Sequence, residues 1–148
     1  MRAWQAANPD FEAVVTGAVL SMPAARHLGF TFGRVAPGEA EIIQPHRAEL
    51  TQHDGFFQGG VLGSLADFAA GSAAGTLLQP GWANMTIDYT VKILAPAKGP
   101  KVVARGRVIK PGVLITIAAA DVFSVGHEDE TLCATALVTM RNVKLVNS

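Results

Sequence analysis

The stretch that decides the fold lies between Phe57 and Gly71 and reads FQGGVLGSLADFAAG. Two glycines come near its start, small and apolar residues fill it, and Asp67 is its one charged side chain. At 100° per residue, a helix places the larger apolar side chains on one side and only small ones beside Asp67. The first set is Leu62, Leu65 and Ala69, and the second is Gly60, Gly63, Ser64, Gly71 and Ala74. We therefore predict a helix from about Gly59 to Leu78 that packs on a sheet and holds Asp67 in a shallow groove.

Asp67 and the double glycine each indicate chemistry. A buried ionised group without a partner costs several kcal/mol, so Asp67 is either a satisfied structural acid or a working one. The glycines let a ligand approach the free N–H groups at the helix start, which carry partial positive charge and suit a carbonyl oxygen. Eight residues separate Gly59 from Asp67, or about 12 Å of helix. A site that uses both therefore needs a second subunit, with its helix antiparallel across a two-fold axis.

The remaining elements predict an α+β fold. A short amphipathic helix is expected from Asp10 to about Met22, and a polar loop from Pro45 to Gln58. Strand patterns cover His27 to Val35, Gly38 to Gln44, Met85 to Leu94, Lys101 to Ile109, Val113 to Phe123 and Thr131 to Val143. This order predicts an antiparallel sheet that wraps one long helix.

The first strand after the long helix alternates regularly. Its polar residues stand at even-numbered positions and its apolar residues at odd-numbered positions. The polar residues are Thr86, Asp88, Thr90 and Lys92, and the apolar residues are Met85, Ile87, Tyr89, Val91 and Ile93. Since side chains of a strand alternate between faces, we expect the first set to be wet and the second to be buried.

Composition narrows the class of protein. The 148 residues fit one domain, and 12 basic residues balance 12 acidic ones, so no overall charge favours nucleic acid or a membrane surface. The single Cys133 has no internal partner and is expected to be a buried, reduced thiol. The N-terminus lacks a continuous apolar segment, and we expect a cytoplasmic protein. His27, His46 and His127 show no metal-ligand spacing, so no metal is expected.

The segment from Leu50 to Val61 and the sequence Leu65-Ala66-Asp67 resemble the hotdog-fold acyl-CoA thioesterases of the phenylacetic-acid-degradation and 4-hydroxybenzoyl-CoA type. The usual signature of that family is His-Gly-Gly followed by a carboxylate eight residues after the first glycine. The resemblance covers about residues 26 to 143 of a single domain spanning 1 to 148. It implies a hotdog fold, homodimers or dimers of dimers (a homotetramer), two active sites at each dimer interface, and no cofactor beyond the coenzyme A of the substrate.

The resemblance also implies roles for particular residues. Asp67 would be the general base or nucleophile, and Gly59 would polarise the thioester carbonyl through its N–H from the facing subunit. Gln52 and Thr86 complete the expected catalytic set. Substrate contacts are expected from Gln58, Gly60, His53 and Phe57, with a core or interface role as the alternative for Phe57.

Gln58 departs from the family pattern, because glutamine can donate a hydrogen bond but cannot exchange a proton near neutral pH. Two other functions stay open. One is a non-catalytic acyl-CoA-binding module on the same scaffold. The other is a hotdog hydratase or dehydratase, which needs a His and an acid across a double bond, and Gln58 replaces the expected His. Arg105 and Arg107, with nearby lysines, are candidates either for coenzyme A phosphates or for an ordinary solvated face.

Overall fold

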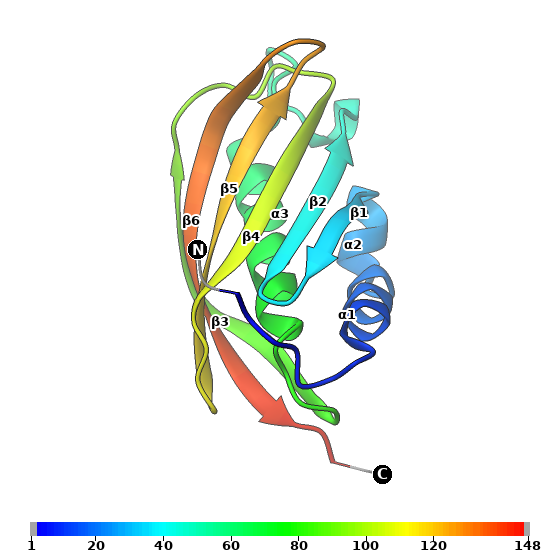
Figure 1. Ribbon diagram of the computed structural model, residues 1–148. Helices are drawn as coiled ribbons and strands as arrows, with labels where there is room; N and C mark the ends of the chain where they lie inside the picture. Colours follow the sequence, from blue (N-terminus) through cyan, green and yellow to red (C-terminus); the bar gives the residue numbers. More distant parts are fainter. Residues whose placement is uncertain (1–2, 147–148) are drawn as a thin grey trace.

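The computed structural model describes residues 3–146 and shows a six-stranded antiparallel sheet curved around one long helix (Figure 1). The strand order is β1-β2-β4-β5-β6-β3. The predicted hotdog fold, with a central helix and a short N-terminal helix, is confirmed. The elements are α1 (Phe11–Leu20), α2 (Pro23–Leu28), β1 (Thr31–Ala36), β2 (Glu39–Pro45), the 3-10 helix η1 (Ala48–Leu50), α3 (Gly59–Gly75), β3 (Trp82–Ile93), β4 (Lys101–Lys110), β5 (Ile115–Val125) and β6 (Glu130–Lys144).

The central helix α3 packs on the sheet through the face that the sequence predicts. Leu62, Leu65 and Ala69 are fully buried. The backbones come very close at one point, where a Cβ atom added to Gly106 of β4 would lie 2.2 Å from the carbonyl oxygen of Ala69. Glycine at position 106 is therefore what allows the sheet to wrap α3 so tightly.

The N-terminal region differs from the prediction. We expected a strand from His27, but residues Pro23–Leu28 form helix α2 and β1 begins only at Thr31. Pro23 occupies the first turn of α2, where its missing N–H costs nothing, and Gly29 ends the helix with a φ of 81°. The long helix also ends earlier than expected, at Gly75.

The alternation predicted for β3 is wrong, because β3 contains a bulge opposite β6 between Thr86 and Asp88. Before the bulge, Asn84 and Thr86 bond to α3. After it, Tyr89 and Val91 lie beside Gly63 of α3. The extra residue reverses which of the alternating side chains face the helix. Before the bulge, Thr86 therefore faces α3, whereas Met85 faces away from it and is exposed.

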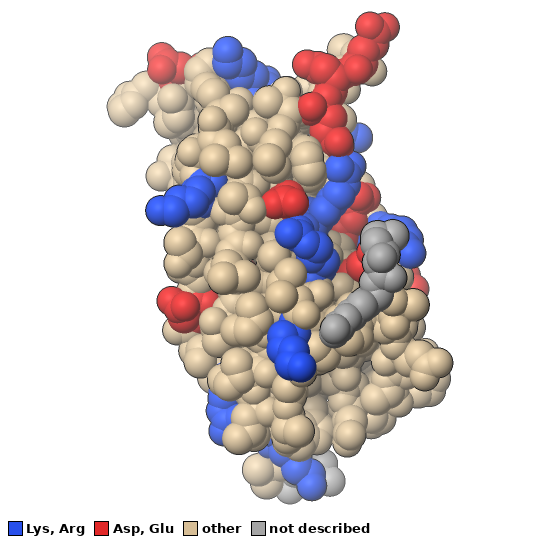
Figure 2. Space-filling view, turned by 60° about the vertical axis from the view of Figure 1, so that its left-hand side comes forward, with Lys and Arg blue, Asp and Glu red and all other residues tan. Residues whose placement is uncertain are grey.

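The edge strand β3 carries exposed apolar side chains. Met85, Ile87, Tyr89 and Ile93, all expected to be buried, are between 43% and 55% exposed. Uncharged residues cover most of the face seen in Figure 2. Elsewhere the core contains Cys133, which is fully buried as predicted. Within residues 3–146, no helix is both long and apolar enough to cross a membrane.

Candidate active site

Asp67 and Thr86 form the polar centre of the site. The Thr86 hydroxyl lies 2.7 Å from Asp67 Oδ1 and donates to it, and the same hydroxyl is 3.3 Å from the sulfur of Met140. Asp67 is half-buried. Burial raises the pKa of its carboxyl above the ordinary value, and the hydrogen bond from Thr86 opposes part of that rise. The result is a carboxylate that is oriented through one oxygen and more basic than a solvated one.

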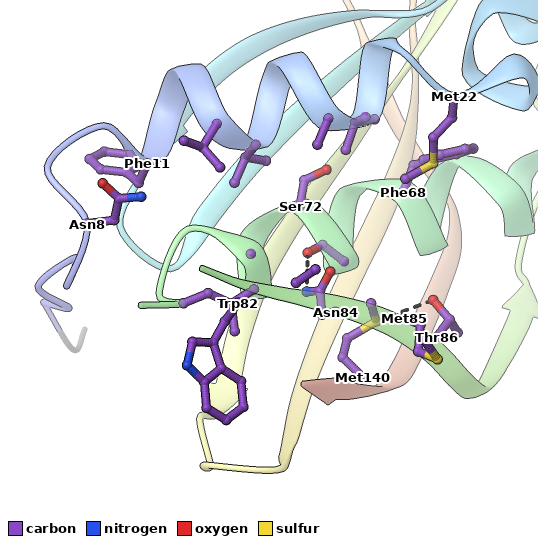
Figure 3. Close-up of a pocket in the computed structure, with 18 of the residues that line it drawn as sticks. Asn8, Phe11, Met22, Phe68, Ser72, Trp82, Asn84, Met85, Thr86 and Met140 are labelled. Atoms are coloured by element: carbon purple, nitrogen blue, oxygen red, sulfur yellow. Dashed lines mark hydrogen bonds between the residues drawn. The ribbon is translucent and has the colours of Figure 1, made fainter. Parts of the chain in front are cut away.

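A cavity of about 390 Å³ opens beside this pair. Figure 3 shows α1 along one side, α3 and β3 along the other, with Phe11 near one end and Phe68, Met22 and Thr86 toward the other. The lining is mostly apolar. An acyl group placed here would have its carbonyl near Asp67 and its body between the two helices.

Gly59 lies in a different hollow, of about 470 Å³, at the start of α3. Gln52, Phe57 and Ile93 share that hollow. Among the hydrogen bonds between described residues, none uses the Gly59 N–H, as expected for the first residue of a helix. This N–H is therefore available to a carbonyl oxygen.

The structure thus divides the predicted catalytic residues into two groups on one chain. Asp67 and Thr86 share the cavity beside α1, whereas Gly59 and Gln52 share the hollow at the start of α3. Gly59 and Asp67 lie in the same helix, α3, so the separation of about 12 Å expected from the helix rise applies to them.

Two polar side chains of the loop before α3, Gln52 and Gln58, accept hydrogen bonds from nearby backbone N–H groups. Gln58 caps α3, since its Oε1 accepts from the Val61 N–H at 3.1 Å, and it lies close to Gly60. Gln52 Oε1 accepts from the backbone N–H groups of Asp54 and Phe56. The Gln52 amide nitrogen is therefore the part of that side chain suited to a ligand.

His53 and Phe57 differ in their surroundings. His53 is exposed in the loop, whereas Phe57 is 3% exposed, belongs to the core and packs edge-on against His46 at 5.5 Å between ring centres. Phe57 therefore supports the loop from within, although it also borders the hollow of Gly59.

Sequence reasoning missed the α1 side of the cavity and the contribution of Ser72 and Asn84. Asn84 donates to the carbonyl oxygen of Gly71 at 3.1 Å. A signal was present, because Phe68, Ser72 and Gly75 recur with helical spacing next to Asp67. Nothing in the pattern, however, indicated that α1 would cover that stripe.

The basic residues considered for coenzyme A binding differ in whether they are paired with acidic side chains. Arg105 bonds to Glu41 and Glu130, and Arg107 bonds to Asp121, so both belong to a paired surface network. Lys98 instead lies 5.3 Å from the ring centre of Phe56, which borders the hollow of Gly59. Over the described part of the chain, no three His, Cys, Asp or Glu side chains gather into a possible metal site.

Comparison with known proteins agrees with this architecture. A thioesterase family protein from Silicibacter pomeroyi is 29% identical over 90% of this chain and 98% of its own, with a TM-score of 0.88. A thioesterase from Haemophilus influenzae is 25% identical over 88% and 89%, with a TM-score of 0.79. The PaaI protein of the E. coli phenylacetic acid degradation operon is 17% identical over 95% and 100%, with a TM-score of 0.81, and shows the shared fold. No protein-family model and no curated protein sequence matches the chain.

The resemblance to hotdog-fold thioesterases predicted from the sequence is therefore confirmed. The similarities to the proteins from Silicibacter pomeroyi and Haemophilus influenzae support the expected class of enzyme, a thioester hydrolase.

Proposed function

We propose that this protein hydrolyses aryl- or medium-chain acyl-CoA thioesters to the free acid and coenzyme A. The observation that carries the proposal is the half-buried Asp67 carboxylate, oriented by Thr86 at 2.7 Å and facing a largely apolar cavity of about 390 Å³. Such a cavity can hold the acyl group, and the carboxylate at its edge is placed to act on the thioester carbonyl at the end of that group.

Asp67 acts as base or as nucleophile. As a base it takes a proton from water while the water oxygen bonds to the carbonyl carbon, and the proton then passes to the departing sulfur as the carbon–sulfur bond breaks. As a nucleophile its oxygen bonds to the carbonyl carbon while the carbon–sulfur bond breaks, so that coenzyme A leaves as a thiolate and a mixed anhydride forms. Water then hydrolyses the anhydride, which releases the acid, restores the Asp67 carboxylate and supplies the proton that the thiolate takes up. The pKa of its carboxyl, raised by burial, favours proton acceptance in the first route.

Gly59 supplies the N–H that polarises the carbonyl, from the other subunit of a homodimer. Two observations support this arrangement: Gly59 and Asp67 lie in separate hollows on one chain, and the edge strand β3 exposes apolar side chains that suit a partner. Backbone donors aimed at a developing oxyanion are worth about 10² to 10³ in rate.

Coenzyme A enters as part of the substrate, and the reaction needs no separate cofactor. Lys98 lies over the ring of Phe56, which borders the hollow of Gly59, and we assign it to the coenzyme A side of the substrate. The other expected substrate contacts lie near this hollow. Gln52, His53 and Gln58 belong to the loop before α3, and Gly60 is the second residue of α3. We place the reaction in the cytoplasm, where a reduced Cys133 is expected.

The first test is thiol release from a panel of aryl- and alkyl-CoA thioesters. Turnover of at least one of them is expected. Tight binding of acyl-CoA without any thiol release would instead identify a binding module, and water addition to an enoyl-CoA would identify a hydratase.

The second test uses Gly59→Pro, which deletes the N–H at a position built to accept proline. Gly59 is the first residue of α3, and Gln58 before it has φ of −69° and ψ of 141°, the extended conformation that a following proline requires. We expect a loss of about 10² to 10³ in kcat/KM. Gly59→Ala keeps the N–H, and its Cβ would be 3.7 Å from Ile93, so it serves as the matched control.

Co-expression of Gly59→Pro with Asp67→Asn then tests the shared site. A mixed dimer has one site with both defects and one site with neither, so about a quarter of the parental activity should return at equal expression. If both groups of each site came from one chain, the mixture would stay as inactive as its components.

A further inference from the structure

We propose that Met140 is a positioning residue, whose sulfur accepts the Thr86 hydroxyl hydrogen whenever Asp67 takes up a proton. Thr86 then serves both protonation states of Asp67, because it donates to the carboxylate before proton transfer and to the sulfur afterwards. This inference rests on the proposed function, since it assumes that Asp67 is the base that accepts a proton from water. It adds a residue of β6 to the groups that act in that step.

The sheet holds Met140 and Thr86 together. They are directly opposite each other in the pairing of β3 with β6, and the Thr86 hydroxyl lies 3.3 Å from the Met140 sulfur. Figure 3 shows both side chains at the lining of the cavity. Met140 is 3% exposed, so water has little access to its sulfur.

Gly71 of α3 leaves room for the end of the Met140 side chain. A Cβ atom added to Gly71 would lie 3.2 Å from the Met140 methyl carbon and 3.6 Å from its sulfur. Gly71 follows Asp67 by about one turn of the helix. The thioether is therefore held between α3 and Thr86, on the side of the helix that carries the carboxylate.

The Thr86 hydroxyl has one hydrogen and two acceptors within reach. Asp67 Oδ1 lies at 2.7 Å and the Met140 sulfur at 3.3 Å. While Asp67 is ionised, the hydrogen points to the carboxylate, because a charged oxygen is a much better acceptor than a thioether. The sulfur is then a second acceptor that is not in use.

Proton transfer to Asp67 reverses this preference. Water gives one proton to Asp67 while the water oxygen bonds to the thioester carbonyl carbon. The neutral carboxyl is a poorer acceptor and can itself donate its new hydrogen to the Thr86 oxygen. The Thr86 hydrogen then turns to the Met140 sulfur and keeps a partner. When Asp67 passes its proton to the departing sulfur of coenzyme A, the Thr86 hydrogen turns back to the carboxylate.

The charged groups around Asp67 leave its titration dependent on Thr86. Among the described residues that line the cavity, Asp67 alone has a titratable side chain. On the neighbouring elements, Glu12 of α1 and Asp88 of β3 are exposed, and Arg141 of β6 donates to backbone carbonyl oxygens. Burial and the bond from Thr86 are what alter the pKa of the Asp67 carboxyl. A change in this titration therefore reports on Thr86 and on the groups that Thr86 contacts.

The variant Met140→Leu tests the inference by carboxyl NMR and by kinetics. Carbon-13 NMR follows the titration midpoint of Asp67 directly, and its signal is assigned by its absence from Asp67→Asn. Leucine has a similar volume but no acceptor, so the protonated state of Asp67 loses a stabilising bond. We expect the midpoint, and with it the acidic limb of the kcat/KM profile, to move to lower pH. The plateau of kcat/KM should fall by about two- to fivefold.

The double variant Thr86→Val/Met140→Leu tests whether Met140 acts through Thr86. Valine keeps the branched shape of threonine without the hydroxyl. Adding Met140→Leu to Thr86→Val should leave the Asp67 midpoint unchanged, because the hydrogen that connects the two groups is absent. Met22→Leu is the matched control, since it removes a sulfur from the α1 side of the same cavity, and it should leave the midpoint of the parent unchanged.

The results separate this inference from the proposed function. An unchanged or higher midpoint in Met140→Leu would overturn the assignment of Met140. An equal downward shift with and without the Thr86 hydroxyl would also overturn it, and the proposed function would stand as long as thioesters are hydrolysed. A parent that hydrolyses no thioester but shows the expected shifts would overturn the proposed function and support the coupling of Met140 to Asp67.

Discussion

Replacing Asp67 with asparagine should make the protein more stable and nearly inactive at the same time. The amide keeps the shape of the side chain and can still accept the hydrogen bond from Thr86 through its oxygen. What it loses is the charge. Within residues 3–146, Asp67 forms no salt bridge with a basic side chain, so the charged form is held by one neutral hydroxyl.

The two expected magnitudes follow from that environment. Loss of a general base lowers kcat/KM by about 10² to 10⁴. The free energy of unfolding at pH 7 should rise, because burial of the carboxylate is unfavourable and raises its pKa. Since Asp67 is only half-buried, solvent screening limits this gain to about 1 kcal/mol.

The pH dependence of stability provides a separate test of the direction in which Asp67→Asn changes the free energy of unfolding. An acid whose pKa is raised by folding contributes no penalty when it is protonated in both states, and the penalty grows as the pH rises through the pKa of the unfolded chain. The stability difference between Asp67→Asn and the parent should therefore be near zero in acid and reach its full size above the folded-state pKa.

Denaturant unfolding at fixed protein concentration over a pH series, with thiol-release kinetics on the same samples, measures both quantities. Glu128→Gln, an exposed carboxylate in the turn before β6 and away from the edge strand β3, is the matched control and should change neither. A variant at Asp67 that is less stable than the parent at pH 7 and keeps turnover within about threefold would refute the reasoning, because Asp67 would then be a structural acid.

Three further changes test the surroundings of the site. Gln58→Ala should lower the free energy of unfolding by about 1 kcal/mol, because the Val61 N–H loses its cap, and should lower kcat/KM by roughly ten- to a hundredfold. Gln58→His should keep kcat/KM within about tenfold of the parent. A hundredfold gain in kcat/KM for Gln58→His would instead mark the parent as a weakened thioesterase. Thr86→Val removes the bond that lowers the pKa of Asp67, so the acidic limb of the kcat/KM profile should move to higher pH; a uniform loss at every pH would contradict that role. Gly106→Ala places a Cβ atom 2.2 Å from a carbonyl oxygen of α3 and should destabilise the fold by about 1 to 3 kcal/mol in thermal unfolding, and a neutral result would show that the helix can shift.

The central helix and the sheet around it could be predicted because their signals are periodic and local. Leu62, Leu65 and Ala69 define a buried face that the structure reproduces. The separation of Gly59 from Asp67 could be predicted too, since helix rise alone fixes it.

Other features depend on contacts that sequence periodicity does not contain. The bulge in β3 inserts one residue opposite β6, and a regular alternation cannot show where parity changes, so Met85 was assigned to the wrong face. Helix α2 was missed because six residues are too few to establish a helical period. The cavity beside Asp67 exists because α1 covers that side of α3, which is a tertiary contact and not a local pattern.

The glycines of α3 have a consequence for how the protein folds. Five of its 17 residues are glycine, and a glycine inside a helix is less favourable than alanine by about 1 kcal/mol. The helix is therefore unlike one that forms early and templates the rest; we expect it to be ordered only as the strands close around it. Gly59 and Asp67 would then gain their spacing in the last cooperative step, and recovery of turnover during refolding should lag behind strand formation and coincide with burial of the helix.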